Sequence, residues 1–346
     1  NAVVGIGANK EIARIVREAL EGKRIETFPP KCELPLEGER VQSTPSYFSY
    51  LKIAEGCDNH CTYCAIPLIR GGYRSRKMED ILAEAEKLAQ WGVKELMVIA
   101  QDTTRYGEDL YGEGKLPQLL TELCKVEGLR WIRVLYCYPE RITDELLEVM
   151  AKEDKILKYM DLPLQHCSRQ VLRAMNRQGD RESLSALIRK IREKVPGIVL
   201  RTTFMVGFPG ETEEAFEELA EFAKEMRFER MGCFAYSQEE GTPAARLPNQ
   251  ISREIKEHRQ ELMMEQQMAL MDEMSREMVG KTITVLNEGW DRYAECCFGR
   301  SAADAPEIDT KVFFTVEGKK PYPGMFVQVE ITDTMDCDLI GQVVTT

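Results

Sequence analysis

Three cysteines lie close together in one short stretch of the chain. Cys57, Cys61 and Cys64 occur in the string EGCDNHCTYCAIPLIRG, with three residues between the first two and two residues between the last two. Thiolates are the ligands of iron–sulfur clusters, and a [4Fe–4S] cube held by protein alone takes four of them. No fourth cysteine follows at a ferredoxin-like spacing. The spacing therefore predicts a cube with one open iron, where a substrate or cofactor could bind.

A structural zinc site is the main alternative for this loop. His60 stands between the cysteines and could be a fourth ligand. Zinc ribbons and knuckles, however, usually combine one C-x2-C pair with a second pair or with two histidines, and neither follows here. A disulfide framework is less favoured still, because the chain has 11 cysteines, an odd number, and shows no secretory leader. These features indicate a reducing compartment, the cytoplasm.

The elements that must position this loop follow from the hydrophobic pattern. Apolar runs alternate with amphipathic helical stretches, which is typical of βαβ units and a parallel sheet. The predicted strands are residues 48–54, 95–100, 131–136, 159–164, 199–206 and 231–236. The predicted helices are residues 78–91, 116–125, 143–151, 181–194 and 213–226. The sequence thus predicts an α/β fold, a partial TIM-like (β/α)6 barrel, smaller than the usual barrel of about 250 residues.

Polar residues return where the predicted strands end. They are Gln101 and Asp102, Tyr138, Gln165 and His166, Gly207 to Glu211, and Ser237. Barrels of this kind place their active sites at the carboxyl ends of the strands. Polarity at one strand end is expected in any fold, but five ends in register with the cysteine loop favour a functional face.

The last third of the chain has a different pattern. Residues 252–278 predict one long helix whose methionines form a packing surface. Short alternating runs then predict a small all-β barrel of five strands with an OB-like shape, at residues 281–286, 293–298, 311–316, 325–331 and 339–344. No segment approaches the run of about 20 apolar residues that spans a bilayer, so no membrane association is expected.

Several strings resemble a known family. The cysteine spacing, with Tyr63 before the last cysteine, resembles the radical S-adenosylmethionine (SAM) superfamily. The strings AQDTTRYG, DLPLQHCS, RAMNR and TTFMVGFPGET resemble its methylthiotransferases, and the β-barrel resembles their TRAM domain. The resemblance implies a remnant of an N-terminal methylthiotransferase domain with a linker (1–45), a radical SAM barrel (46–250), a connecting helix (251–279) and a TRAM domain (280–346).

The resemblance also implies roles for individual residues. The three cysteines would hold three irons of the cluster, and SAM would bind the fourth and yield a 5′-deoxyadenosyl radical. Tyr63 would border the adenine of SAM. The other expected cofactor-binding residues are Gln101, Gln165, Arg201, Gly207 and Gly210. Arg201 would bind the methionyl carboxylate or pair with a nearby aspartate, the glycines would let the backbone approach the cofactor, and His166 is expected to be a packed, hydrogen-bonded residue.

The substrate is expected to be a protein. The family modifies either an adenine of transfer RNA or the β-carbon of an aspartate in the twelfth small-subunit ribosomal protein. The strings LPLQH and YSQEEGTPAARL resemble the protein-modifying branch. Residues 281–346 carry six Lys and Arg against eleven Asp and Glu, a net charge of 6 − 11 = −5, which suits a basic ribosomal protein and not RNA phosphates. A transfer-RNA enzyme and a non-catalytic electron-transfer module remain alternatives.

Two further expectations concern neighbouring parts of the chain. The basic residues Arg70, Arg74, Arg76 and Lys77 are expected to frame the mouth of the cluster site. The chain begins at Asn1 without Met, and the family carries a second [4Fe–4S] cluster in its N-terminal domain. We therefore expect a truncated form that binds one cluster, cleaves SAM with electrons from a flavodoxin or ferredoxin, and does not complete sulfur insertion.

Overall fold

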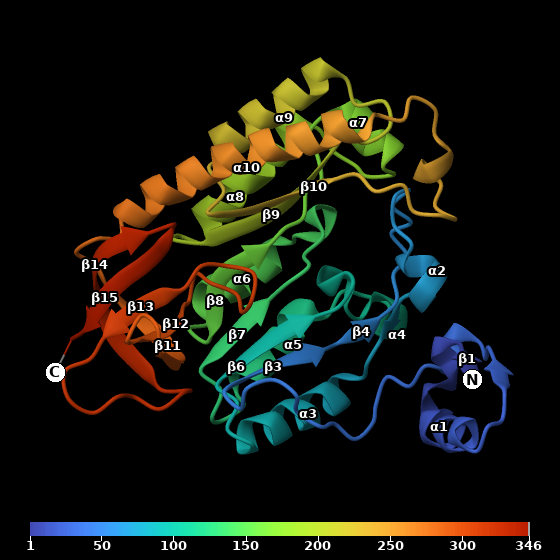
Figure 1. Ribbon diagram of the computed structural model, residues 1–346, viewed down its shortest axis with the longest axis horizontal. Helices are drawn as coiled ribbons and strands as arrows, with labels where there is room; N and C mark the ends of the chain where they lie inside the picture. The colour runs from blue at the N-terminus through green and yellow to red at the C-terminus, as the bar shows by residue number, and fades with distance from the viewer. Residues whose placement is uncertain (345–346) are drawn as a thin grey trace.

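A parallel sheet forms the centre of the computed structural model, which describes residues 1–344 (Figure 1). Its six strands run in the order β3-β6-β7-β8-β9-β10, and all neighbours are parallel. They are β3 (Phe48–Lys52), β6 (Glu95–Ile99), β7 (Trp131–Val134), β8 (Ile156–Asp161), β9 (Val199–Val206) and β10 (Arg230–Ala235). Strands β3 and β10 do not pair, so the predicted partial (β/α)6 barrel is confirmed.

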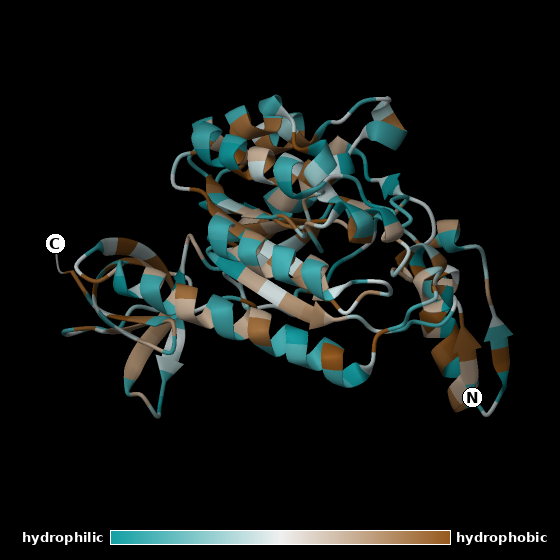
Figure 2. Ribbon diagram, turned by 90° about the horizontal axis from the view of Figure 1, so that it is seen from above, coloured by the Kyte–Doolittle hydropathy of each residue, from teal (hydrophilic) through white to brown (hydrophobic). Residues whose placement is uncertain are grey.

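Helices cover the outer face of this sheet, and their apolar sides pack against it (Figure 2). The main ones are α3 (Met78–Gln90), α5 (Leu116–Cys124), α6 (Asp144–Lys152), α8 (Arg181–Lys194) and α9 (Glu213–Met226), close to the predicted ranges. Each buries residues at helical spacing, as α3 does with Ile81, Ala85 and Leu88. Shorter helices that the sequence did not predict are α2 (Ile66–Arg70), α4 (Glu108–Tyr111) and α7 (Arg169–Ala174). No helix of residues 1–344 is long and apolar enough to cross a membrane.

The C-terminal β-barrel, residues 280–344, is closed. Its strands are β11 (Thr282–Asp291), β12 (Cys296–Ser301), β13 (Val312–Thr315), β14 (Phe326–Met335) and β15 (Asp338–Val343). All five predicted strands are present, with β13 and β15 parallel and the other neighbours antiparallel. Closure pairs both edges of the sheet, so no long strand edge is left open.

The concave side of the parallel sheet is filled partly by the C-terminal β-barrel. Leu286 and Ala305 of that barrel share an apolar cluster with Phe48, Met97 and Tyr159 of the sheet. The loop between β12 and β13 reaches into this face, where the Tyr159 hydroxyl donates to the Asp309 carboxylate at 2.6 Å. One end of the sheet's interior is therefore closed by residues more than 140 positions later in the chain.

A long helix, α10 (Arg253–Arg276), connects the two barrels. It runs along β10 and ends against β14 (Figure 1). Gln267 donates to the carbonyl of Phe228, and Ser275 donates to the carbonyl of Cys337. The predicted packing role of the methionines is confirmed for buried Met263, but it is wrong for Met268, which is 61% exposed.

The N-terminal segment forms a small separate unit of two parallel strands and a helix. They are β1 (Ala2–Val4), β2 (Ile25–Thr27) and α1 (Ile12–Leu20).

Near the parallel sheet, β4 (Ala54–Glu55) pairs with β5 (Arg74–Ser75). Arg74 donates to the carbonyls of Cys32 and Leu34, and Arg76 pairs with Glu37. The prediction that Arg74 and Arg76 frame the cluster mouth is therefore wrong, because both hold the linker against the barrel.

Candidate active site

The cysteine loop folds back on itself immediately after β4. The Cys57 amide donates to the carbonyl of Gly71 at 3.2 Å, and the Cys64 amide donates to the carbonyl of Cys61 at 3.0 Å. Gly56 has φ +80°, and a Cβ atom there would lie 2.1 Å from the carbonyl oxygen of Gly72. Only glycine fits this close crossing of two backbones. The three thiols are half-buried as a result.

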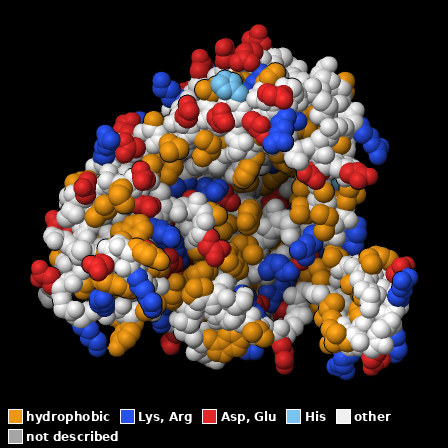
Figure 3. Space-filling model, in the orientation of Figure 1, with side chains coloured by type: hydrophobic (Ala, Val, Ile, Leu, Met, Phe, Trp, Pro, Cys, Tyr) orange, Lys and Arg blue, Asp and Glu red, His pale blue; other side chains and the backbone are white. Residues whose placement is uncertain are grey.

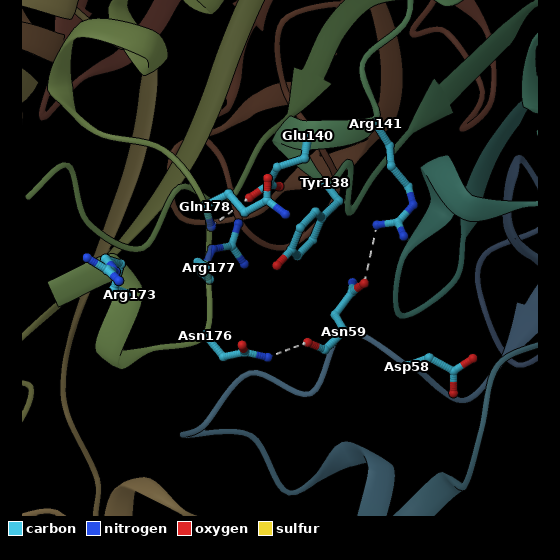
Figure 4. Close-up of a pocket in the computed structure, with 9 residues that line it drawn as sticks. All are labelled: Asp58, Asn59, Tyr138, Glu140, Arg141, Arg173, Asn176, Arg177 and Gln178. Carbon is cyan, nitrogen blue, oxygen red and sulfur yellow. Dashed lines mark hydrogen bonds between the residues drawn. The ribbon is translucent and has the colours of Figure 1, made fainter. Parts of the chain in front are cut away.

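Asn59 anchors the loop to the ends of several strands (Figure 4). Its amide group donates to the Asp102 carboxylate at 2.8 Å, and its side-chain oxygen accepts from Arg141 at 3.3 Å. Its backbone carbonyl accepts from the Asn176 side chain at 3.3 Å. Asp102 is 1% exposed and also accepts from the Thr104 hydroxyl at 2.6 Å. The loop is therefore fixed by segments that follow β6, β7 and β8.

The donor chemistry of the loop fits an iron–sulfur cluster. Burial raises the pKa of Cys57 to about 11 and also raises the pKa of Cys64, so metal must displace their protons. Within residues 1–344, no three His, Cys, Asp or Glu side chains converge to hold one metal ion. The irons of a cube each take a separate thiolate.

A cavity of about 620 Å³ lies beside the loop. Figure 3 shows that this side of the molecule is hollowed and that basic side chains gather near the hollow. Tyr138 and Arg141, from the segment after β7, and Arg177, from the segment after α7, point into the cavity (Figure 4). The Tyr138 hydroxyl lies 3.9 Å from the Cys61 sulfur. The cavity wall therefore contacts a predicted cluster ligand directly.

Three predicted cofactor residues, Tyr63, Gln101 and Gln165, come from the cysteine loop and from the segments after β6 and β8. Tyr63 packs against an apolar cluster that includes Phe208 and Tyr236, and burial raises its pKa. Gln101 donates to the Glu55 carboxylate at 3.2 Å, while its side-chain oxygen is buried with no hydrogen-bond partner among the described residues. Gln165 has φ +69° and bridges to Phe204. An unpaired buried acceptor at Gln101 is the kind of group that a bound polar molecule would satisfy.

Arg201 and the two glycines have other surroundings. The Arg201 guanidinium lies 3.7 Å from Asp161 and 3.5 Å from Asp309, so the predicted alternative of pairing with a nearby aspartate is observed. At Gly207, a Cβ atom would lie 2.2 Å from Cγ of Lys256. This glycine admits the start of α10 there, whereas Gly210 has open space on that side. Their cofactor roles stay predictions.

His166 is a packed, hydrogen-bonded residue, as the sequence predicts. Its Nδ1 accepts from the Ser168 amide at 2.9 Å, which leaves the proton on Nε2, 3.0 Å from the Glu211 carboxylate. Glu211 also accepts from the Gly207 amide and from Arg259 of α10. This buried hydrogen-bond network fixes the loops after β8 and β9. It leaves neither His166 nor Glu211 exposed for acid–base chemistry.

Known families and relatives match nearly the whole chain. Residues 51–223 match the radical SAM superfamily, and residues 279–344 match the TRAM domain. The ribosomal protein uS12 methylthiotransferase RimO of Caldanaerobacter subterraneus subsp. tengcongensis is 49% identical over 99% of this chain and 78% of its own length. The RimO of Pelotomaculum thermopropionicum is 50% identical over the same shares.

The chain belongs to the RimO family. Among solved structures, coproporphyrinogen III oxidase (HemN) from Escherichia coli, a radical SAM enzyme, matches with a TM-score of 0.49 and 18% identity, over 66% of this chain and 53% of that one. The family assignment rests on the sequence relatives, since a structural likeness at this level adds no argument.

Three side chains of this RimO-family site were not singled out from the sequence. Glu55 is fully buried and accepts from Lys52 and Gln101, next to the first cysteine. Arg141 and Arg177 line the cavity. Arg177 stood in a string that carried the family resemblance, but nothing local to it indicated burial. Glu55 and Arg141 carried no comparable signal, because their partners lie in other strand-end loops.

Proposed function

We propose that this chain performs the radical SAM chemistry of a ribosomal protein uS12 aspartate methylthiotransferase. The observation that carries the proposal is the loop of Cys57, Cys61 and Cys64 at the carboxyl ends of the strands, in a chain 49–50% identical to RimO proteins over 99% of its length. These cysteines would hold a [4Fe–4S] cluster, with SAM on its open iron. When bound, the cluster and SAM together supply the radical chemistry that abstracts hydrogen from an unactivated carbon.

The residues of the chain position this chemistry and protect it. Asn59 and Asp102 hold the cysteine loop in register with the strand ends. Tyr63 and the side-chain oxygen of Gln101 offer an aromatic face and an acceptor to the cofactor. The C-terminal β-barrel closes the opposite end of the sheet's interior through Tyr159 and Asp309. Exclusion of water and oxygen is needed because a reactive intermediate would otherwise attack the protein.

The proposed substrate is the aspartate β-carbon of a basic ribosomal protein. Its support is the naming of the relatives and the net charge of −5 on residues 281–346. An acidic surface speeds association with a basic partner and repels RNA phosphates. We therefore propose no direct contact with RNA. The electron donor would be a flavodoxin or ferredoxin of the cytoplasm, a compartment that suits eleven free cysteines.

Anaerobic reconstitution of the chain with iron and sulfide tests the cofactor part of the proposal. We expect about four irons per chain and reductive cleavage of SAM to 5′-deoxyadenosine, and we expect Cys61→Ala to lose both. Cys124→Ala, which changes a thiol on helix α5, is the matched control. It is expected to keep both the iron content and the cleavage of SAM. A full cluster without cleavage would support an electron-transfer module, and zinc in place of iron would support a structural site.

The substrate is tested separately by binding. Purified uS12 and unmodified transfer RNA are each titrated against the reconstituted protein at several salt concentrations. We expect uS12 to bind, with an affinity that falls as salt rises, and transfer RNA to bind weakly or not at all. Preference for transfer RNA would contradict the protein-modifying assignment and favour the RNA-modifying branch of the family.

A further inference from the structure

Two basic side chains beside the cysteine loop share a single carboxylate. Other arginines near the strand ends are fully paired, since Arg201 and Arg141 each face two carboxylates. The Lys52 ammonium donates to Oε2 of Glu55 at 2.7 Å, and a guanidinium nitrogen of Arg70 lies 3.6 Å from the same oxygen. No other carboxylate of residues 1–344 lies within ion-pair distance of either cation. The group of three side chains therefore has one positive charge in excess.

Strand geometry places this excess charge on the interior side of the parallel sheet. Tyr50 of β3 packs against the apolar cluster that the sheet shares with the C-terminal β-barrel. Side chains alternate along a strand, so Lys52 faces the same interior, one step nearer to the cysteine loop. Glu55 comes two residues before Cys57, and Arg70 is the last residue of α2, the short helix after the loop. The excess charge thus lies at the rim of the interior, beside the loop.

Both cations have donors left for a ligand. An ammonium group has three donors, and Lys52 gives one of them to Glu55. The Arg70 guanidinium lies beyond hydrogen-bond distance of that carboxylate. The two side chains are 38% and 41% exposed, whereas that of Glu55 is 1% exposed and also accepts from Gln101 and the Gly56 amide. Glu55 is therefore fixed from several sides, while the two cations remain open to a second carboxylate.

We propose that Lys52 and Arg70 bind the side-chain carboxylate of the substrate aspartate, with Glu55 holding the two cations in place. The inference rests on the proposed function, because that function is what assigns an aspartate as the target. A carboxylate accepts strong charge-assisted hydrogen bonds from Lys and Arg, and a neutral amide of the same shape gains less. The two residues would select aspartate over asparagine. They would also hold the β-carbon, which is bonded to the carboxylate carbon, near the cysteine loop.

The binding of two labelled peptides tests this selection. One peptide spans the target aspartate of uS12, and the other has asparagine at that position. Both are titrated against the reconstituted protein by fluorescence anisotropy. We expect the wild type to bind the aspartate peptide about tenfold more tightly. Lys52→Met and Arg70→Met should each reduce this preference to less than about threefold, and Lys52→Arg, which keeps the charge, should retain most of it.

Lys77→Met is the matched control, since Lys77 belongs to the same basic stretch after the cysteines and is exposed. It removes one positive charge that has no contact with Glu55. We expect the preference to stay within about twofold of the wild-type value. Iron content and SAM binding are measured for every variant, with circular dichroism as the check on folding. If Lys52→Met does not fold, Arg70→Met provides the test, because its partly exposed side chain tolerates the change.

The outcomes separate this inference from the proposed function. Equal affinity of the wild type for the two peptides, or a full preference in both Lys52→Met and Arg70→Met, would overturn the inference alone. Loss of iron together with loss of preference in Lys52→Met would assign Lys52 to holding the cysteine loop and would also overturn it. So would an unchanged preference with weaker SAM binding, which would place the cations on the cofactor carboxylate. A wild type that binds transfer RNA and neither peptide would overturn both proposals.

Discussion

Asn59 connects three strand ends to the cysteine loop through a single side chain and its carbonyl. Its partners Asp102, Arg141 and Asn176 follow three different strands and stand 43, 82 and 117 positions away. Loops that carry metal ligands are flexible unless such contacts fix them, and fixed ligands bind metal more tightly. The position of the thiols therefore depends on an amide that is not itself a ligand.

Asn59→Ala is expected to weaken the hold on the cluster without unfolding the chain. It removes the hydrogen bonds to Asp102 and Arg141 and leaves the three thiols in place. We expect iron to be lost to a chelator roughly 10 to 100 times faster than from the wild type. The measurement is the absorbance of the iron–chelator complex over time, with circular dichroism as the check on folding.

The adjacent residue supplies the control for this prediction. His60 is exposed and makes no side-chain hydrogen bond within the described part of the chain. His60→Ala should therefore leave the rate of iron loss unchanged. If His60→Ala lost metal and Asn59→Ala did not, the histidine would be a ligand, and the cluster assignment would have to give way to a zinc site.

At the scale of elements, hydrophobic periodicity predicted almost every strand and main helix within a few residues. Strands such as β6, with the sequence ELMVI, are buried on both faces and give continuous apolar runs. Asp180 caps helix α8 in a capping box, and the predicted range of the helix matches the observed one. The fold class was predictable because these signals are local. The division of the chain at residues 45, 250 and 279 stays a prediction.

The surroundings of single side chains were less predictable, because they depend on contacts between distant segments. The partner of Arg201 in the C-terminal β-barrel, Asp309, is 108 positions away, and the basic run after the cysteines turned out to bind the linker. Short elements such as α7 and β2 lack enough residues to show a period. The role of the cysteine loop, which its spacing predicts, stays a prediction.

Hydrogen bonds from His166 and Arg259 to Glu211 connect the loops after β8 and β9 to α10. Glu211→Ala should break this connection. The change leaves the buried Arg259 without one of its partners and the Gly207 amide without an acceptor. Removing one member of a buried ion pair costs about 3–5 kcal/mol in the free energy of unfolding. Urea unfolding followed by circular dichroism measures the loss.

Glu213→Ala is the matched change on the same arginine. Glu213 pairs with the other amine of Arg259 at 2.7 Å, but its side chain is 66% exposed. An exposed pair contributes at most about 1 kcal/mol. Equal losses of unfolding free energy in Glu211→Ala and Glu213→Ala would show that burial of this hydrogen-bond network is not what stabilises the connection between α10 and the barrel.

At the scale of the whole molecule, buried ion pairs join the two barrels into one body. Arg300 of the C-terminal β-barrel donates to Glu95 of the parallel sheet at 2.7 Å, and Arg133 of the sheet donates to the same carboxylate at 3.0 Å. Arg230 of the sheet also pairs with Asp304 of the loop between β12 and β13. These contacts keep the acidic barrel at a fixed position relative to the cysteine loop, at opposite ends of the sheet's interior (Figure 1).

Arg300→Met should loosen the C-terminal β-barrel from the sheet. The substitution leaves Glu95 with Arg133 alone, and we expect a loss of about 3 kcal/mol in the free energy of unfolding. Trp131 packs against Phe326 across this interface, so its fluorescence should shift to longer wavelength at lower urea concentration than in the wild type. Arg292→Met, which removes an exposed arginine of the same barrel, should leave both readings unchanged.

Acid should weaken the same interface through Glu95. Burial alone would raise the pKa of this carboxyl, but Arg300 and Arg133 outweigh it and hold the pKa below the ordinary value of 4.5. The unfolded chain therefore takes up the proton first, so the contribution to stability is complete above pH 4.5 and is lost as the pH falls through the folded-state pKa.

Glu95→Gln resembles the protonated carboxyl in shape and charge. We expect it to be about 3 kcal/mol less stable than the wild type at neutral pH, with the difference shrinking as acid protonates the wild-type residue. Urea titrations of both proteins from neutral pH downward measure this, and a difference that stayed constant with pH would show that Glu95 contributes through packing and not through its charge.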